Sequence, residues 1–338
     1  MDRRVPRAGT VRRALPLAVA AVALAAAACH APLEDPSLVV DLRVLGIRTD
    51  PPEVLYTAPS PYTIPDTVDR SFTLTVLLAD PTGAGRTLRC RLQSCPLPSS
   101  NSWCTDPANT WGLGEQDCTA GETTFQVTLP ADLVQAVQQG DSADKACVGA
   151  QAGLALAACG YSGLAVWIDV VVTGGERELH ALKSFVLSPV VPDDRKANQN
   201  PDIAGLALEG ALLPDPPTFP FVPGAQSQLD LAWPGGQLLN VEQHYRLPTF
   251  GGGTVDLDEY VTVSYYADAG SFSTGHASDQ PSNPFGGKPS GSEPVDLSTR
   301  WTAPRAGEPG AAGPVHFWFV VTDGRGGVRW LTAIANRG

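Results

Sequence analysis

The sequence is short of charge and of the side chains that usually bind metal ions. Charged residues make up 17% of the 338, and acidic residues outnumber basic ones by 35 to 23. The resulting net charge of −12 excludes proteins that hold nucleic acid through clustered Lys and Arg. The single Met is the initiator, and the five His are scattered without the close spacing of a metal site.

Glycine and proline, by contrast, are abundant. The chain has 34 Gly and 31 Pro, and 43% of its residues are hydrophobic. This composition favours many turns and short strands around a substantial core, and it argues against a helical bundle. Since domains usually contain about 100 to 200 residues, the length predicts two of them.

Residues 1–28 have the pattern of an export signal. Five Arg lie between positions 3 and 13, and an apolar run follows from Ala14 to Ala28. A basic start followed by about 15 small apolar residues is typical of a secretory signal, because a membrane-spanning helix needs about 20.

This segment ends in Leu24-Ala25-Ala26-Ala27-Ala28-Cys29, which resembles the lipobox of bacterial lipoproteins. The usual Leu three positions before the Cys is here Ala26. The resemblance implies cleavage before Cys29 and a diacyl lipid on it, with anchoring in the membrane by several acyl chains. The next residue is His30, whereas some lipoproteins have an Asp here that retains them at the inner membrane. We therefore expect the protein to be anchored in the outer membrane, at its periplasmic face or at the cell surface. The alternative is ordinary signal cleavage that releases a soluble protein with a free Cys29.

The other cysteines agree with export. Six of them lie between positions 90 and 159, at Cys90, Cys95, Cys104, Cys118, Cys147 and Cys159. An even number in an exported chain predicts three disulfides, and the absence of a C-x-x-C spacing argues against zinc and redox sites. Fifteen pairings are possible. Local closure favours Cys95–Cys104 and Cys147–Cys159, with Cys90–Cys118 around the first.

Apolar alternation and turn residues predict two strand-rich units joined by a linker. The first unit, residues 38–191 after a tether at 29–37, has expected strands at 38–47, 71–79, 88–92, 124–129, 164–173 and 178–187, and a helix at 130–139. Residues 96–123 are expected to form a disulfide-stapled insertion. The linker is 192–202. The second unit, 203–338, has expected strands at 203–208, 228–232, 238–245, 260–267, 299–302, 315–322 and 328–335, with a mobile loop at 271–293.

The strand at 315–322 is apolar on both sides, which predicts a central position in its sheet. Val315, Phe317, Phe319 and Val321 share one side, and Trp318 and Val320 lie on the other.

The second unit resembles the polycystin-type (PKD) and related bacterial immunoglobulin-like modules. The matching residues run from Val263 to Phe272, from Arg300 to Pro304 and from Phe317 to Gly327, where the last hairpin turns at Asp-Gly-Arg-Gly-Gly. Gly supplies the positive φ that hairpin turns need. The resemblance implies an immunoglobulin-like β-sandwich for the second unit, and the number and spacing of the expected strands predict the same for the first. The expected fold is therefore all-β, with two immunoglobulin-like β-sandwich domains, the first carrying the disulfide-rich insertion and the short helix. The whole layout resembles surface lipoproteins of GC-rich bacteria.

Candidate catalytic groups are few. Ser271 and Ser273 lie near His276, but a loop rich in Ser, Gly and Pro offers no rigid turn for a nucleophile. The carboxylates Asp256, Asp258 and Glu259, like the pair Asp193 and Asp194, are interpreted as surface charge. Trp301, Trp318 and Trp330 could line a sugar-binding face, although packing is the more frequent role of such residues.

Calcium is the one cofactor that the sequence suggests. The linker offers oxygen ligands from Asp193, Asp194, Asn198, Asn200 and Asp202, and Asn198 to Pro201 resembles the calcium-stiffened linkers of cadherins without their fixed order of ligands. The favoured alternative is a flexible, solvated tether without a metal ion.

These observations favour a non-enzymatic, lipid-anchored protein of the cell envelope that binds a partner or acts as a structural spacer. Its expected partners are the membrane, through the lipid, and another envelope protein or a glycan. The alternative is an envelope hydrolase or carbohydrate-active lipoprotein with dispersed catalytic residues.

Overall fold

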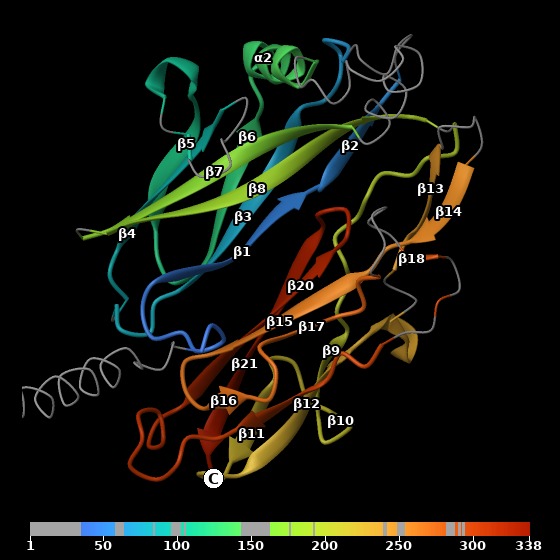
Figure 1. Ribbon diagram of the computed structural model, residues 1–338. Helices are drawn as coiled ribbons and strands as arrows, with labels where there is room; N and C mark the ends of the chain where they lie inside the picture. Colours follow the sequence, from blue (N-terminus) through green and yellow to red (C-terminus); the bar gives the residue numbers. More distant parts are fainter. Residues whose placement is uncertain are drawn as a thin grey trace, which may run out of the picture. The chain divides into compact units, whose positions relative to one another are not determined.

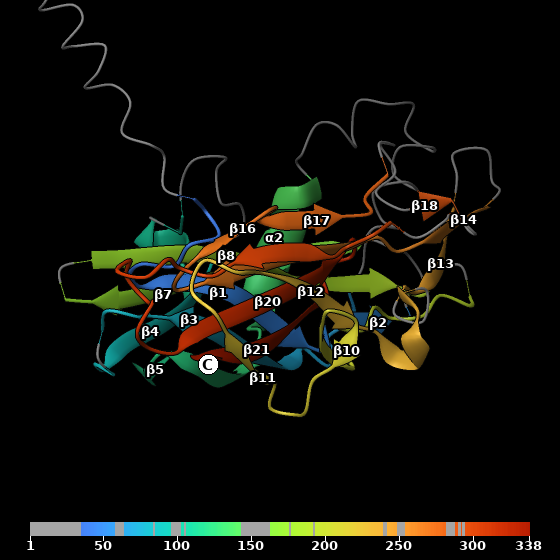
Figure 2. The same ribbon diagram turned by 90° about the horizontal axis from the view of Figure 1, so that it is seen from below.

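Two pairs of β-sheets and a small fifth sheet build the described part of the chain (Figures 1 and 2). Each pair encloses its own apolar core. The computed structural model describes residues 35–57, 64–83, 85–95, 103–104, 106–142, 163–175, 177–191, 193–238, 242–248, 254–281, 288–289, 292 and 295–338. The signal peptide, Cys29, Cys147 and Cys159 lie outside these residues. Contacts group Pro36–Gly338 into one compact unit.

The first sandwich consists of eight strands and one helix. Its elements are β1 (Arg43–Asp50), β2 (Glu53–Tyr56), β3 (Ser71–Ala79), β4 (Leu88–Ser94), β5 (Trp111–Cys118), β6 (Gly121–Thr128), α2 (Ala131–Ser142), β7 (Leu164–Gly174) and β8 (Arg177–Pro189). One sheet has the order β1-β3-β6 and the other β2-β8-β7-β4-β5. Leu74 and Val76 of β3 and Val170 of β7 lie fully buried between the sheets, and Leu133 and Val137 of α2 join the same core.

The second sandwich is larger. Its elements are β9 (Gly205–Leu208), β10 (Ala211–Leu212), β11 (Thr218–Phe221), β12 (Gln226–Ala232), β13 (His244–Pro248), β14 (Thr254–Asp258), β15 (Val261–Ala267), β16 (Ser271–Phe272), β17 (His276–Ser278), β18 (Lys288–Pro289), β19 (Thr299–Thr302), β20 (Val315–Asp323) and β21 (Val328–Arg337). Its two main sheets run β10-β9-β12-β19-β16 and β11-β21-β20-β15-β17, and a small third sheet runs β13-β14-β18. Trp301, Phe317 and Phe219 lie at the centre of its core.

Both sandwiches repeat one strand order. The strands β9, β12 and β19 are neighbours in the same order as β1, β3 and β6, and the sheet β11-β21-β20-β15-β17 corresponds strand by strand to β2-β8-β7-β4-β5. In each five-stranded sheet of this kind, a short early strand pairs in parallel with the last strand: β2 with β8, and β11 with β21. An Asp-Pro-Pro sequence precedes that short strand both times, at Asp50 and at Asp215, with a cis bond before the first Pro. Two largely antiparallel sheets packed face to face over one apolar core are the architecture of immunoglobulin-like domains. The fold is therefore all-β, with two immunoglobulin-like sandwiches.

Several sequence-based predictions are confirmed. The strands at 71–79 and 299–302 begin and end as predicted, and β7 and β8 form the predicted hairpin. The expected helix begins one residue later than predicted and ends at Ser142. Strand β20 lies between β15 and β21, in the middle of its sheet.

Residues 96–123 are more regular than predicted. They include β5, which pairs with β4 along its whole length, and the beginning of β6. Strand β5 lies at the edge of its sheet, is little buried and consists mostly of polar residues and glycine. It therefore lacks the alternation of apolar residues from which the other strands were predicted.

The region 271–293 was also wrongly predicted as a loop throughout. It contributes β16, β17 and β18, each of two or three residues, to three different sheets. Such short edge strands carry too few residues for a periodic pattern.

Two disulfides hold the insertion. Cys90 in β4 is bonded to Cys118 at the end of β5, with Cα atoms 5.9 Å apart, and Cys95 is bonded to Cys104 across nine residues. Both pairs are those favoured by local closure.

Candidate functional site

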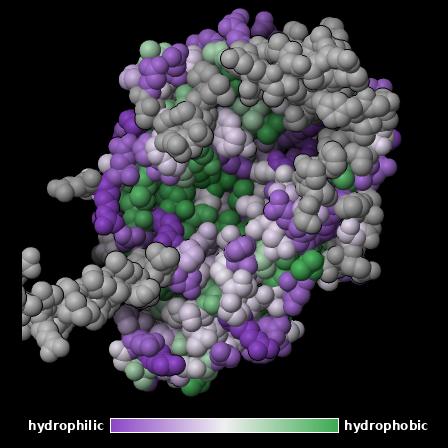
Figure 3. All heavy atoms as spheres, viewed as in Figure 1, coloured by the Kyte–Doolittle hydropathy of each residue, from purple (hydrophilic) through white to green (hydrophobic). Residues whose placement is uncertain are grey.

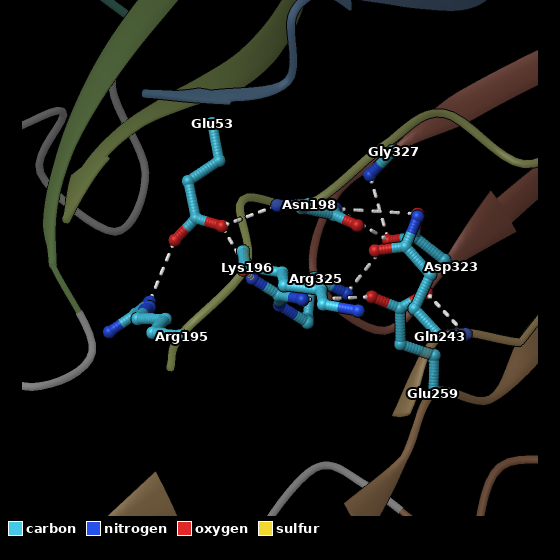
Figure 4. A network of polar contacts seen from close by, with 9 residues as sticks. All are labelled: Glu53, Arg195, Lys196, Asn198, Gln243, Glu259, Asp323, Arg325 and Gly327. Carbon is cyan, nitrogen blue, oxygen red and sulfur yellow. Dashed lines mark hydrogen bonds and ion pairs between the residues drawn. The ribbon is translucent and has the colours of Figure 1, made fainter. Parts of the chain in front are cut away.

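Buried charges gather where the connecting segment 193–202 passes between the two sandwiches (Figure 4). We call this group, made of six side chains, the joint network. Glu53 begins β2, Arg195 and Asn198 belong to the connecting segment, Glu259 lies between β14 and β15, Asp323 ends β20, and Arg325 lies in the turn before β21.

Glu53 is the contribution of the first sandwich to the joint network. Its Oε1 atom accepts a hydrogen bond from Arg195 Nη2 at 2.7 Å, and its Oε2 atom accepts one from the backbone N–H of Asn198 at 2.6 Å. The same Oε2 atom accepts a further hydrogen bond from Arg325 of the second sandwich. Only 4% of Glu53 is exposed, so this one carboxylate ties the two sandwiches and the segment between them together.

Arg325 is the residue of the second sandwich that contacts Glu53. Its Nη1 atom donates to Glu259 Oε1 at 3.2 Å, and its Nη2 atom donates to the carbonyl of Lys196 at 3.3 Å. The guanidinium carbon lies 5.0 Å from the centre of the Tyr245 ring, which is within range of a cation–π interaction. Arg325 is thus held by charge on two sides and by an aromatic ring.

Asp323 sets the shape of the turn that carries Arg325. Its carboxylate accepts hydrogen bonds from the backbone N–H groups of Arg325 and Gly327, each at 2.8 Å, and from Asn198 Nδ2 at 3.3 Å. A Cβ atom at Gly327 would lie 2.0 Å from Asp323 Oδ2, so this position requires glycine. Gly326 has the positive φ, 96°, that the sequence analysis expected in this turn.

Burial changes the acidity of several groups at the joint. Loss of solvent, reinforced by the nearby charge of Asp323, raises the pKa of Glu259 to about 8. Burial also raises the pKa of Asp323 itself. The pKa of Lys183, which donates to the carbonyl of Gly326, is lowered by burial to about 8. Burial thus shifts the pKa values of Glu259 and Lys183 toward neutrality from opposite sides.

An apolar cluster continues the same interface. Val39, Leu45, Leu77 and Ala79 from the first unit pack with Val320, Val328 and Trp330 from the second. Arg48 lies over the Trp330 ring at 4.7 Å, and Trp330 Nε1 donates to Glu122 Oε1 at 2.7 Å. Apolar residues on the outer faces of β3 and β20 are covered by this contact.

The connecting segment is not the solvated tether that the sequence favoured. Asn200 donates through Nδ2 to the carbonyl of Thr49 in β1 and accepts through Oδ1 from the N–H of Val328 in β21, both at 2.9 Å. Asn198 is 1% exposed. The prediction was wrong because it rested on the small number of apolar residues in the segment, whereas hydrogen bonds from Asn198 and Asn200 hold the segment to both sandwiches.

Four of the five residues suggested for calcium have hydrogen-bond or ion-pair partners of their own. Asn198 and Asn200 are hydrogen-bonded as above, Asp194 contacts Arg246 at 3.0 Å, and Asp202 accepts the N–H of Ile203, while Asp193 is exposed. Among the residues that the structure describes, no three His, Cys, Asp or Glu side chains are placed to hold a metal ion. Calcium at the joint thus stays the less favoured alternative of the sequence analysis.

Other sequence candidates have structural partners. Trp301 is fully buried in the second core, Trp330 is buried in the joint, and Trp318 packs partly against the same cluster. Glu259 was interpreted as surface charge and is instead buried in the joint network. Ser273 accepts the N–H of Arg300 through Oγ, and His276 is exposed.

A second polar cluster lies beneath the disulfide Cys95–Cys104. Asp169 is fully buried and accepts a hydrogen bond from Gln93 Nε2 at 2.9 Å. His180 Nδ1 lies 3.1 Å from Asp169, its Nε2 lies 3.0 Å from Glu178, and Trp103 stacks on its ring. Because both ring nitrogens face carboxylates, this histidine is not directed at a nucleophile.

Two surfaces are open to a partner. A cleft of about 450 Å³ lies beside β16 and β19, between Val40, Asp268, Ser271, Pro304, Arg305 and Glu308. On the outer face of the β7–β8 hairpin, Trp167 and Leu182 are 36% and 37% exposed, and Figure 3 shows hydrophobic side chains gathered on this part of the molecule. In the described part of the chain, no helix is long and apolar enough to cross a membrane.

Comparisons with known proteins give only distant likenesses. No protein-family model matches the chain, and no curated protein does. Among solved structures, Escherichia coli alpha-2-macroglobulin activated by porcine elastase aligns with 90% of this chain and 22% of its own length, at 8% identity and a TM-score of 0.25. The two tandem V-type regions of VCBP3, a v-region-containing chitin binding protein, align with 87% of this chain over their full length, at 13% identity and a TM-score of 0.24. The Yersinia pseudotuberculosis adhesin InvE aligns with 86% of this chain and 58% of its own, at 11% identity and a TM-score of 0.18. The assignment of the fold rests on the strand pairing.

Proposed function

We propose that this chain is an exported, lipid-anchored protein of the cell envelope that works without catalysis. Its two sandwiches act together as one rigid module, which binds a partner or serves as a structural spacer. The lipid on Cys29 would hold the module at the outer membrane, and the partner would be another envelope protein or a glycan.

The joint network is the observation that carries this proposal. Neighbouring domains move relative to each other unless a large apolar interface holds them. Here an apolar cluster and the buried ion pairs of Glu53 with Arg195 and Arg325 lie side by side in the interface. Removing one partner of a buried ion pair costs about 3–5 kcal/mol, because the other charge stays buried and uncompensated. A hinge motion that separated Glu53 from Arg325 would meet the same cost, so the geometry favours a fixed arrangement.

Export and binding have separate support. Disulfides form and persist in oxidising compartments, and Cys90–Cys118 and Cys95–Cys104 both have the separation of ordinary disulfides. The cleft beside β16 has a volume typical of sites for small ligands, and the outer face of β7–β8 offers apolar side chains to a larger partner.

Small-angle scattering on the chain from residue 30 tests the rigid module. The maximum dimension should be the same with calcium and with a chelator, because Asn200 is already engaged through both its side-chain oxygen and its side-chain nitrogen with the two sandwiches. The double variant Asn198→Ala, Arg325→Ala should show a larger maximum dimension and the profile of a flexible pair. The matched control is Asp193→Ala with Asp194→Ala, which removes exposed carboxylates of the same segment and should match the unaltered chain.

Two outcomes would contradict the rigid module. One is a flexible profile for the unaltered chain. The other is a clear extension on addition of calcium that the Asp193→Ala, Asp194→Ala variant loses, which would make the joint a calcium-set spacer instead.

A further inference from the structure

A lysine in the second sandwich is enclosed between two carboxyl groups. Lys288, in the short strand β18, has its Nζ atom 2.5 Å from Asp279 Oδ2 and in contact with Glu242 Oε1. The exposed fractions of the three side chains are 4% for Lys288, 0% for Asp279 and 1% for Glu242. These groups come from different segments: Asp279 directly follows β17, and Glu242 precedes β13.

A plain salt bridge accounts poorly for this arrangement. Two carboxyl groups face a single ammonium group, and desolvation costs several kcal/mol for each buried ion. Within the described residues, the second oxygen of Glu242, Oε2, is buried without a hydrogen-bond partner. Amide formation, by contrast, requires all three groups: an amine (Lys288), a carboxyl group for it to attack (Asp279) and a second carboxyl group to transfer protons (Glu242).

The carboxyl group of Asp279 is held in place for attack. Its Oδ1 atom accepts the N–H of Val261 at 2.5 Å, and its own N–H donates to the carbonyl of Val261 at 3.1 Å. A backbone N–H on Oδ1 polarises the carboxyl carbon and can stabilise the negative oxygen of a tetrahedral intermediate. The other oxygen, Oδ2, faces the lysine and is free to leave.

Glu242 is suited to move the protons. Burial, together with the neighbouring Asp279, raises the pKa of Glu242 to about 7, so the group both accepts and releases a proton near neutrality. For Lys288, burial lowers the pKa, but the hydrogen bonds to Asp279 and Glu242 outweigh it and keep the pKa above its usual value. The amine therefore needs a base in direct contact before it can act as a nucleophile, and Glu242 is in that position.

We propose that Lys288 and Asp279 form an intramolecular isopeptide bond, with Glu242 as the proton-transfer group. Glu242 takes one proton from the Lys288 ammonium group, and the neutral Nζ atom attacks Cγ of Asp279. The C–Oδ2 bond then breaks while Nζ loses a second proton. Oδ2 leaves with both protons as one water molecule, so an ammonium and a carboxylate become an amide and water without any oxidant or cofactor.

Enclosure makes the condensation favourable. Reacting groups held in contact have effective concentrations of about 10⁵–10⁸ M, which offsets the excess of water that drives amide hydrolysis. The product also replaces two buried charges with a neutral amide. The bond would join the end of β17, in a main sheet, to β18, in the small sheet β13-β14-β18, and so fasten the small sheet to the sandwich.

Mass spectrometry of the purified full chain tests the bond directly. Lys288 is followed by Pro, so trypsin leaves Asp279 and Lys288 in one peptide, residues 247–300. After reduction and alkylation, this peptide should be lighter than its sequence by one water molecule. Chymotrypsin then cuts after Phe285, between the two residues, and the two pieces should stay joined.

Matched variants assign the roles. Lys288→Arg keeps the charge but cannot form the amide, and Glu242→Gln keeps the shape but cannot transfer the proton. In both variants the tryptic peptide should have its full mass and should separate into two pieces after chymotrypsin. Circular dichroism should show that both variants are folded. Lys183→Arg, at another buried lysine that contacts a carbonyl instead of a carboxylate, should keep the bond. A full-mass peptide from the unaltered chain would overturn the proposal. So would a peptide that has lost water but separates after chymotrypsin, because that result indicates a cyclised Asp279 instead.

Discussion

Individual residues at the joint have properties that their neighbours in the sequence do not reveal. Glu259 follows Asp256 and Asp258 and has the composition of a solvated acidic patch, yet it is buried against Arg325, 66 positions further along the chain. Glu53 likewise follows two Pro in what looks like a turn and becomes the centre of the interface. Long-range pairing of this kind depends on the packing of complete sandwiches.

The burial of Glu259 predicts a dependence of stability on pH. Its pKa is about 8 in the folded protein and lower when the chain is unfolded and the group is hydrated. Between about pH 5 and pH 8 the folded protein therefore keeps a proton that the unfolded chain releases, and the free energy of unfolding falls as the pH rises. Glu259→Gln removes this titration, so the slope should become less negative by up to about 1.4 kcal/mol per pH unit.

Urea unfolding across that pH range measures the slope. Asp256→Asn is the control, because it neutralises a more exposed carboxylate of the neighbouring strand and should leave the slope as in the unaltered chain. If Glu259→Gln and the unaltered chain gave equal slopes, Glu259 would not be titrating as a buried acid.

At the level of strands and helices, periodic apolar segments could be predicted and polar ones could not. Strands β3, β7, β15, β20 and β21 carry enough alternating apolar residues to be located from the sequence alone. Strand β5 and the short strands between 271 and 293 have small or polar residues at sheet edges, where little burial is required.

The sequence feature that could have predicted the interface between the sandwiches is the apolar outer face of β3 and of β20. The sequence analysis explained the second apolar face of β20 by a central position in the sheet. The structure adds another cause, because Val320 on that face packs against Leu77 and Ala79 of the first sandwich. A strand that is apolar on both faces in an exposed sandwich therefore indicates a covering partner.

The two disulfides of the insertion should differ in their contribution to stability. Loop-closure entropy increases with the length of the loop, and Cys90–Cys118 closes 28 residues whereas Cys95–Cys104 closes nine. Cys90→Ala with Cys118→Ala should lower the free energy of unfolding by about 2–4 kcal/mol, and by about 1 kcal/mol more than Cys95→Ala with Cys104→Ala. Equilibrium unfolding of both double variants under non-reducing conditions provides the comparison. The larger effect from the shorter loop would mean that packing around Cys104, and not loop closure, dominates.

At the scale of the whole molecule, the acidic character of the chain determines how it can be held at a membrane. A net charge of −12 gives no electrostatic attraction to anionic lipid or lipopolysaccharide. A covalent lipid anchor would hold such a module at the membrane without this attraction. The sequence offers one in Cys29, directly after the apolar run.

Lipidation at Cys29 is accordingly expected to attach the protein to the membrane. Several acyl chains together give stable anchoring, since each buried CH₂ contributes about 0.8 kcal/mol, whereas ionic contacts are screened by salt. A high-salt wash of the native envelope should therefore leave the protein bound, and detergent should release it with acyl mass on an N-terminal Cys29. Cys29→Ala should accumulate as the uncleaved precursor, while His30→Ala, at the adjacent position, should be processed and anchored as before. Release by salt alone, or a mature N-terminus with an unmodified thiol, would show that the chain is held by its protein surface instead.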